Sequence, residues 1–160
     1  MILALLACVA HGPPPGTTPT SGGSYGPVAP AAEPRFVGQT PWESLPVIST
    51  PSGLRYWVLK DGHGPHPQSG QKVKLHYTGW LADGRKFDSS YDRGVPITYT
   101  HGVGQVIKGW DEAVGGMQVG ERRRIEVPPD IGYGSRARGL IPADATLIFE
   151  MELIEIAPGY

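Results

Sequence analysis

The sequence predicts an α+β fold, in which a sheet packs its concave face on one short helix. Residues 72–80 alternate between apolar and polar side chains, with Val73, Leu75 and Tyr77 on one face, as in a half-buried strand. Residues 106–114 carry the one helical pattern, an apolar stripe that repeats at helical spacing. One short amphipathic helix among strands has to bury its stripe against a sheet.

The first half of the predicted sheet is organised around residues 76–92. A strand is expected over 53–60 from its aromatic and β-branched content, and a second over 72–80. Asp83-Gly84 supplies a tight turn, and residues 85–88 begin the return. Phe87 and Asp88 are neighbours in an extended segment and should point to opposite faces. Both can enter one site only if the chain bends, and we expect the bend at Ser89-Ser90.

The second half adds three strands, the helix and a long loop. Strands are expected over 97–100, 121–127 and 146–156, and the helix should end at Gly115-Gly116 as a C′ glycine ends one. In the last strand the inward face is apolar and the glutamates face out; the inward residues are Leu147, Phe149, Met151 and Leu153. The three arginines at 122–124 are expected on a solvated sheet face with cross-strand ion pairs.

Residues 128–142 are too rich in Gly and Pro for either a strand or a helix. Long loops in compact domains are often functional. Tyr133 lies between two glycines, which offer its ring no side chain to pack on, and Leu140, Ile141 and Pro142 form an apolar tip. This loop is therefore a candidate for part of a site.

The composition bounds the domain organisation and the partners. The chain has 160 residues and a net charge of −1, which gives neither the basic footprint of a nucleic-acid-binding protein nor a polybasic membrane patch. Residues 9–46 are rich in Gly, Pro, Ser and Thr without hydrophobic periodicity, and are expected to form a flexible linker, with Trp42 docked on the domain or marking its edge. Residues 47–160 form the expected single domain, a monomer.

Residues 1–8 are apolar and end in Cys8, the one cysteine of the chain. Leu5-Leu6-Ala7-Cys8 resembles a bacterial lipobox, in which the cysteine is lipidated. The segment is too short to span a bilayer. It is also shorter than a usual signal h-region and no basic residue precedes it, and a start assigned too far downstream would account for both departures. The lipoprotein hypothesis places the domain at the cell envelope, in the periplasm or on a membrane through this anchor. The alternative is a frayed apolar terminus with a free thiol on a cytoplasmic protein.

Several classes of chemistry lack their residue patterns. The expected domain, residues 47–160, contains no Gly-x-Ser-x-Gly elbow, no His-Glu-x-x-His motif and no dinucleotide fingerprint around Gly102 and Gly104. His63 and His66 share a turn without the further ligands that a structural zinc site needs, so we expect no metal and no cofactor. The conspicuous side chains are apolar or aromatic with Asp88 as the polar exception, and they suggest an apolar cleft for an apolar ligand.

Five segments in order resemble the FKBP-type peptidyl-prolyl cis-trans isomerases. The resemblance spans residues 53–156, and the segments are 73–79, 86–90, 105–110, 128–134 and 141–149. It implies a strongly bent antiparallel sheet wrapped round one short α-helix, with the site between them. It also implies isomerisation of X-Pro bonds in unfolded or nascent polypeptides, as in protein folding, and inhibition by FK506-type macrolides.

The resemblance also implies roles for individual residues. Trp110 would form the floor of the pocket, and the walls would be Tyr77, Phe87, Ile141 and Phe149. Asp88 would orient the substrate amide, held by Arg93 and Tyr77, while Tyr133 and the Ile107 backbone N–H would bind carbonyl groups. Val106 completes the implied pocket. The chain departs from the family at the rim, at Ile97, Gln105 and the short loop 134–140 with Arg136 and Arg138.

Two other functions are compatible with the sequence. The aromatic residues would also make an ordinary core. A module or holdase chaperone that binds Pro-containing segments with little turnover is the main alternative to the enzyme, and the altered rim supports it. A third possibility is a lipoprotein whose domain serves mainly as an interaction partner at the cell envelope.

Overall fold

The computed structural model describes residues 41–158. The expected lipobox, Cys8 and residues 9–40 of the expected linker lie outside this range. No helix within 41–158 is long and apolar enough to cross a membrane.

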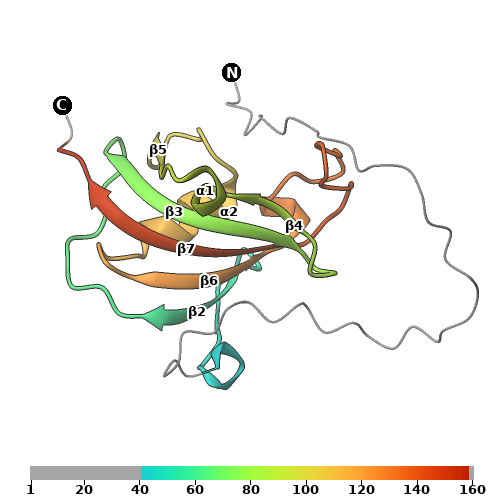
Figure 1. Ribbon diagram of the computed structural model, residues 1–160, viewed down its shortest axis with the longest axis horizontal. Helices are drawn as coiled ribbons and strands as arrows, with labels where there is room; N and C mark the ends of the chain where they lie inside the picture. The colour runs from blue at the N-terminus through green and yellow to red at the C-terminus, as the bar shows by residue number, and fades with distance from the viewer. Residues whose placement is uncertain (1–40, 159–160) are drawn as a thin grey trace, which may run out of the picture.

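Seven strands form one antiparallel sheet, in the order β1-β2-β6-β7-β3-β4, with β5 also paired to β3 (Figure 1). Strands β4 and β5 share one edge of β3: β5 pairs with its first half and β4 with its second. The strands are β1 (Ile48–Ser49), β2 (Arg55–Lys60), β3 (Lys72–Leu81), β4 (Lys86–Ser89), β5 (Ile97–Thr100), β6 (Arg122–Val127) and β7 (Leu147–Ile156). The expected α+β class with a bent antiparallel sheet is confirmed.

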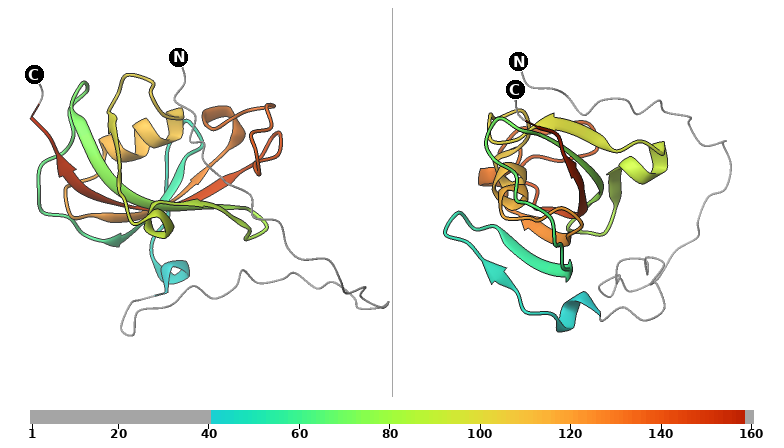
Figure 2. Two further views of the ribbon diagram at one scale, coloured as in Figure 1. Left: turned by 45° about the horizontal axis from the view of Figure 1, so that its top comes forward. Right: turned by 90° about the vertical axis from the view of Figure 1, so that its left-hand side faces the viewer.

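The core lies between the sheet and helix α2 (Lys108–Gly115), which packs against the concave face (Figure 2). Alternate residues of the central strands point toward this helix because successive side chains of a strand take opposite faces. The inward residues of β3 and β7 are buried as the alternation predicts, and they include Val73, Leu75, Tyr77, Leu147, Phe149, Met151 and Leu153. The helix contributes Trp110, Ala113 and Val114 to the same cluster.

Helix α2 ends at Gly115, as expected, but its start and the backbone geometry after its end differ from the expectation. The helix begins at Lys108, because Ile107 has an extended backbone with ψ of 148°. Val106 and Ile107 therefore belong to the segment that enters the helix. Gly116 follows the helix with φ of −91°, in the right-handed region, so the expected C′ glycine geometry is absent there.

Short elements are present that hydrophobic periodicity did not indicate. Ser90–Arg93 forms the one-turn helix α1, which ends at Gly94 with φ of 67°. Strand β1 adds a two-residue edge to β2, and single 3₁₀ turns occur at Trp42–Ser44 and Pro129–Ile131. Elements this short cannot display a period, so their positions depend on contacts made elsewhere in the fold.

The three arginines of β6 lie on different faces, so their expected placement on one solvated face is wrong in part. Arg122 and Arg124 form the expected cross-strand ion pairs with Glu150, at 3.4 and 3.0 Å. Arg123 points into the core, where it pairs with the buried Glu121 and donates hydrogen bonds to the Ala113 and Gly116 carbonyls. Strand alternation explains the split, because neighbouring side chains cannot share a face.

The convex face of the sheet carries a cluster of Trp42, Trp57, Trp80 and Arg124. The Trp42 and Trp57 rings meet edge to face, with centroids 5.2 Å apart. The Arg124 guanidinium carbon lies 4.2 Å from the Trp42 ring centroid and 5.9 Å from that of Trp80. Trp42 thus docks on the sheet, although it precedes the expected start of the domain at residue 47.

Candidate functional site

Four aromatic rings from four elements meet on the concave face. The Trp110 ring of α2 lies 4.8 Å from the Tyr77 ring of β3 and 5.2 Å from the Phe149 ring of β7, at interplanar angles of 76° and 83°. Phe87 of β4 contacts Phe149 at 5.6 Å and 87°. Edge-to-face pairs of this kind favour one fixed arrangement of the rings. The Trp110 ring is therefore held in one orientation by nearly perpendicular Tyr77 and Phe149 rings, as the rigid floor of an apolar pocket would be.

A β-bulge brings Phe87 and Asp88 into the same site. Asp88 pairs with Gly79 and Lys86 pairs with Trp80, so Phe87 is the extra residue on β4. An extra residue breaks the alternation and turns the strand locally. The expected bend at Ser89-Ser90 thus occurs earlier, and Ser90 instead begins helix α1.

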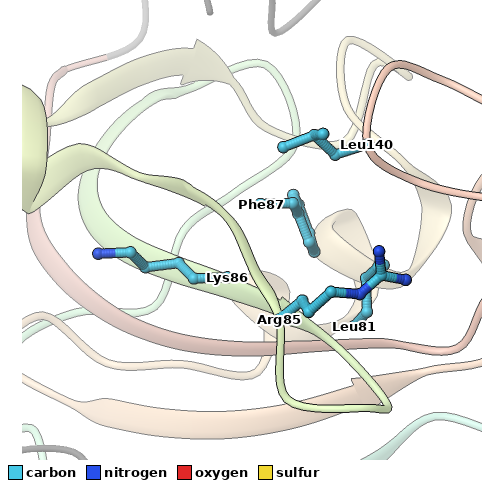
Figure 3. Close-up of a pocket in the computed structure, with 5 residues that line it drawn as sticks. All are labelled: Leu81, Arg85, Lys86, Phe87 and Leu140. Atoms are coloured by element: carbon cyan, nitrogen blue, oxygen red, sulfur yellow. The ribbon is translucent and has the colours of Figure 1, made fainter. Parts of the chain in front are cut away.

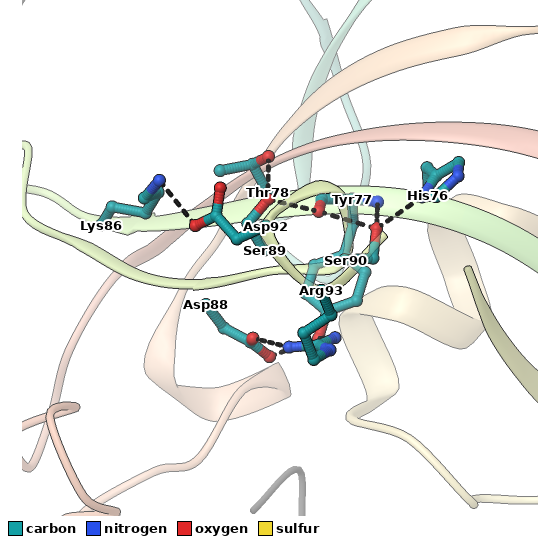
Figure 4. Close-up of polar contacts among 9 residues, drawn as sticks. All are labelled: His76, Tyr77, Thr78, Lys86, Asp88, Ser89, Ser90, Asp92 and Arg93. Carbon is teal, nitrogen blue, oxygen red and sulfur yellow. Dashed lines mark hydrogen bonds and ion pairs between the residues drawn. The ribbon is translucent and has the colours of Figure 1, made fainter. Parts of the chain in front are cut away.

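Asp88 accepts hydrogen bonds from two neighbours, as Figure 4 shows for Arg93. The Tyr77 hydroxyl donates to Oδ2 of Asp88, and Nη1 of Arg93 donates to Oδ1. Nη2 of Arg93 also donates to the Tyr77 oxygen at 3.0 Å, which closes a triangle of three residues. The expected contacts of Asp88 with Arg93 and Tyr77 are present.

The environment of this triangle favours a protonated Tyr77 hydroxyl. Burial, followed by the hydrogen bond to Asp88, raises the pKa of Tyr77 far above its usual value. Desolvation lowers the pKa of Arg93, but its hydrogen bonds with Tyr77 and Asp88 outweigh this and raise the pKa overall. Tyr77 therefore serves as a donor at neutral pH and has no tendency to act as a base.

Helix α1 is fixed to β3 by hydroxyl groups that the sequence reasoning did not assign. The Ser90 hydroxyl accepts a hydrogen bond from the Tyr77 N–H at 2.8 Å and donates to the Tyr77 carbonyl at 3.1 Å. The Ser89 and Thr78 hydroxyls are 3.0 Å apart, and Lys86 pairs with Asp92 at 2.7 Å (Figure 4). These contacts set the position from which Arg93 reaches Asp88. Ser90 is fully buried, and burial of a serine has no signature in a single sequence.

The loop after β6 places Tyr133 and Ile141 against the same core. Arg138 and Ile141 exchange two backbone hydrogen bonds, of 2.8 and 2.9 Å, around a tight turn at Gly139 and Leu140. Ile141 is 7% exposed and belongs to the core cluster, and Tyr133 packs on that cluster. Burial raises the pKa of Tyr133 in spite of the nearby Arg138. No hydrogen bond within 41–158 uses its hydroxyl, which can therefore donate to a ligand.

The remaining predicted residues border the site. Val106, Ile107 and Ile97 are partly buried and pack on the core cluster. The Ile107 carbonyl accepts from the Trp110 N–H at 3.0 Å, whereas none of the hydrogen bonds found in residues 41–158 uses the Ile107 N–H. Gln105 accepts a hydrogen bond from the Thr100 N–H at 2.8 Å, so its side-chain oxygen is occupied within the protein.

The predicted floor and walls expose very little surface. Trp110 and Phe149 are each 3% exposed and Tyr77 is 0% exposed. Tyr77 therefore packs beneath the other residues of the site and does not line an open surface. A hollow of about 260 Å³ lies beside Phe87, bounded also by Leu81, Arg85, Lys86 and Leu140 (Figure 3). Phe87 thus separates this open hollow from the aromatic cluster.

The structure brings the predicted residues together, while their assignment to catalysis stays a prediction. Residues that sequence reasoning missed are mainly those that shape the site without a reactive group. Gly79 is one, because an added Cβ would lie 2.7 Å from Phe87 and 2.9 Å from Phe149. A glycine in an otherwise regular strand is the signal that could have indicated such a close approach.

Comparisons with known proteins agree with this architecture. The pattern of the family described as FKBP-type peptidyl-prolyl cis-trans isomerase matches residues 64–154. An FK506-binding protein of Neisseria meningitidis serogroup A is 54% identical over 99 residues, which cover 61% of this chain and 91% of that protein. A peptidyl-prolyl cis-trans isomerase of Schizosaccharomyces pombe is 48% identical over 106 residues, which cover 65% and 95%.

Two solved structures have the same fold. The crystal structure of AtFKBP13 matches with a TM-score of 0.68 at 41% identity, and the match covers 70% of this chain and 99% of that one. The structure of FkpA from Escherichia coli matches with a TM-score of 0.67 at 34% identity, over 71% of this chain and 53% of that one.

Proposed function

The chain belongs to the FKBP-type peptidyl-prolyl cis-trans isomerase family, and from this we propose that the aromatic site around Trp110 accelerates X-Pro rotation by binding the twisted amide. Members of this family are isomerases that take proline-containing substrates and bind FK506-type macrolides. The substrates proposed here are unfolded or nascent polypeptides.

The proposed catalysis is differential binding of the transition state. Rotation about a peptide bond has a barrier of about 18–20 kcal/mol, because amide resonance is lost when the bond twists. The twisted amide has a less polar carbonyl than the planar one, so an apolar pocket disfavours the ground state more than the transition state. Trp110 would support the proline ring, with Phe87, Phe149, Ile141 and Tyr77 around it. Such a mechanism needs no nucleophile.

Polar groups at the edge of the cluster would hold the substrate chain. The Tyr133 hydroxyl and the Ile107 N–H are donors without an acceptor among residues 41–158, and each would donate to a substrate carbonyl. Asp88 would orient the amide, and the triangle with Tyr77 and Arg93 fixes its carboxylate. Two unused donors beside a rigid apolar cluster are the observation that carries the proposal.

A protease-coupled isomerisation assay on X-Pro peptides tests this assignment with the full chain. Phe87→Ala removes a half-buried wall and should lower kcat/KM by at least about tenfold, because the lost contact is one made to the twisted proline. Tyr91→Ala, which removes an exposed aromatic side chain outside the site, is the matched control and should leave kcat/KM unchanged. Full activity of Phe87→Ala would exclude the site.

Asp88→Asn separates orientation from chemistry in the same assay. The amide keeps the shape of the side chain but removes the charge that Arg93 and Tyr77 hold. We expect a smaller loss than for Phe87→Ala, because Asp88 is proposed to position the amide only. Complete loss of activity in a folded Asp88→Asn protein would show that this carboxylate takes part in the chemistry.

A second function is favoured by the hollow beside Phe87. Its apolar residues Leu81 and Leu140 could hold a chain segment without access to Trp110, as a holdase or Pro-segment binding module would. Peptide binding without acceleration of rotation, and without competition by an FK506-type macrolide, would support this alternative. Acceleration that the macrolide inhibits would support the isomerase site.

For the cellular location we propose a lipid-anchored protein of the cell envelope, working in the periplasm as a folding chaperone. The supporting observation is the Leu5-Leu6-Ala7-Cys8 segment followed by a Gly- and Pro-rich stretch that would act as a spacer. Incorporation of a labelled fatty acid that Cys8→Ser abolishes would support the anchor. Equal recovery of both proteins in the soluble fraction without label would reject it, in favour of a cytoplasmic protein. Sedimentation would test the expected monomer.

A further inference from the structure

Arg138 lies at the edge of the proposed site in a fixed position. Its guanidinium carbon is 5.3 Å from the centroid of the Tyr133 ring. Its backbone N–H and carbonyl both form hydrogen bonds with the backbone of Ile141. The Arg138 residue is half-buried, whereas Arg136 in the same loop is exposed. A guanidinium that stacks on an aromatic face and is anchored by its backbone loses little freedom when it binds an anion.

Two arginines at the edge of the site, Arg138 and Arg136, have no acidic partner within residues 41–158, unlike three other cations near it. Arg85 pairs with Asp83, Lys86 pairs with Asp92, and Arg93 is bound to Asp88. Among residues 41–158, no carboxylate forms an ion pair with Arg138 or Arg136. A half-buried cation without a counter-ion is a place where a carboxylate of a bound chain gains from both charge and hydrogen bonds.

We propose that Arg138 makes the enzyme prefer substrates with a glutamate or aspartate within two residues of the proline. This rests on the proposed function, since it assumes that Tyr133 contacts a substrate carbonyl. A chain bound there would pass the face of Tyr133 that Arg138 covers, and a flanking carboxylate would reach the guanidinium. Arg136 contacts Tyr133 through its backbone N–H, which lies 3.4 Å from the Tyr133 carbonyl oxygen. Its exposed side chain would add only a screened, longer-range attraction.

The test compares peptides that differ by one charge. Glutamate is exchanged for glutamine at each of the two positions before and after the proline, and kcat/KM is measured with the full chain at low salt. At the preferred position the Glu peptide should be about three to five times better, the range expected for a partly exposed ion pair. This ratio should fall toward one in 1 M salt, where charges are screened within about 3 Å.

Two variants assign the preference to one residue. Arg138→Gln should bring the Glu/Gln ratio to about one, and Arg138→Glu should reverse it, because like charges then meet. Arg136→Gln is the matched control: it removes one positive charge from the same loop and should keep most of the ratio. Circular dichroism of each variant shows whether it is folded.

The outcomes separate this inference from the proposed function. Equal kcat/KM for Glu and Gln at all four positions, or a preference that Arg138→Gln retains, would overturn the role of Arg138 while leaving the isomerase site intact. Absence of acceleration for every peptide would reject the proposed function. In that case calorimetric Kd values for the same peptide pairs decide the role of Arg138. Tighter binding of the Glu peptide that is lost in Arg138→Gln would support the role. Equal Kd values for the Glu and Gln peptides would oppose it.

Discussion

Gly79 lies so close to Phe87 that a Cβ on Gly79 would be 2.7 Å from Cζ of the phenylalanine ring. The same Cβ would be 2.9 Å from the Phe149 ring, so the absence of a side chain at this point of β3 lets both rings pack over the strand. Gly79 is also the residue opposite Asp88 across the bulge. One glycine therefore leaves room for the two phenylalanines and pairs with the strand residue that carries the carboxylate of the site.

We expect Gly79→Ala to displace the Phe87 and Phe149 rings. Overpacking of a well-filled core costs about 1–3 kcal/mol, and here the strained contacts are with rings of the proposed pocket. The variant should lose stability by this amount and lose at least about tenfold in kcat/KM, measured by urea unfolding and by the isomerisation assay. Gly64→Ala, whose added Cβ would press on Val119 outside the site, should lose stability without losing activity. Unchanged activity in a destabilised Gly79→Ala protein would contradict the proposed role of the rings.

Glu121→Gln, at the residue just before β6, should destabilise the protein more than substitutions on the outer face of β6. Glu121 and Arg123 form an ion pair with side chains only 7% and 6% exposed, and Arg123 also holds the Ala113 and Gly116 carbonyls at the end of α2. Removal of one partner leaves a buried charge and costs about 3–5 kcal/mol. Arg122→Gln, which breaks a pair on the outer face, should cost about 1 kcal/mol or less. Urea unfolding followed by tryptophan fluorescence measures both, and equal losses would refute the distinction.

Stability should decline at alkaline pH. Burial raises the pKa of Tyr77, Tyr99 and Tyr133 in the folded protein above the ordinary value of 10.0. Below pH 10 these hydroxyls are protonated in both the folded and the unfolded state, so they do not make the free energy of unfolding depend on pH. Above pH 10 the unfolded chain releases protons that the folded protein retains, so the free energy of unfolding falls as pH rises. Urea midpoints between pH 8 and 11.5 measure this fall.

Tyr99→Phe provides the control for the alkaline effect. The Tyr99 hydroxyl is buried without a hydrogen-bond partner in residues 41–158, so its removal should change stability little at pH 8. The variant should lose less stability than the unmodified protein between pH 10 and 11.5, because one fewer proton is retained on folding. Identical pH profiles would show that Tyr99 does not contribute.

Trp42→Ala should destabilise the domain without affecting the site. Trp42 contacts Trp57 edge to face and stacks on the Arg124 guanidinium, both on the convex face of the sheet. An aromatic pair and a cation–π contact together contribute about 1–2 kcal/mol. Thermal unfolding should show this loss, while kcat/KM stays the same because the site is on the concave face. Glu43→Ala serves as the control, and an equal melting temperature for both variants would show that Trp42 does not stabilise the fold.

Much of the sheet could be predicted because its signals are local. The alternation in β3 and β7 marks the inward residues correctly, and the Ile97–Thr100 strand is confirmed residue for residue. The pocket residues came from resemblance to a family, since spacing alone left Tyr77, Phe87, Trp110 and Phe149 equally compatible with an ordinary core. Burial of Tyr77, Trp110 and Phe149 shows that these rings do serve in the core, whichever of them also contacts a substrate.

Periodicity along the chain was enough to establish which residues of the long strands face inward, because each side chain's direction follows from that of its neighbours. The bulge at Phe87, the one-turn helix at Ser90–Arg93 and the hydrogen bonds of Arg123 to the end of α2 required the folded structure. Each of these depends on a residue of another element: Gly79 of β3 for Phe87, Tyr77 of β3 for Ser90, and the end of α2 for Arg123. Single-sequence patterns carry no information on such partners, and the polar geometry of the site around Asp88 is built from them.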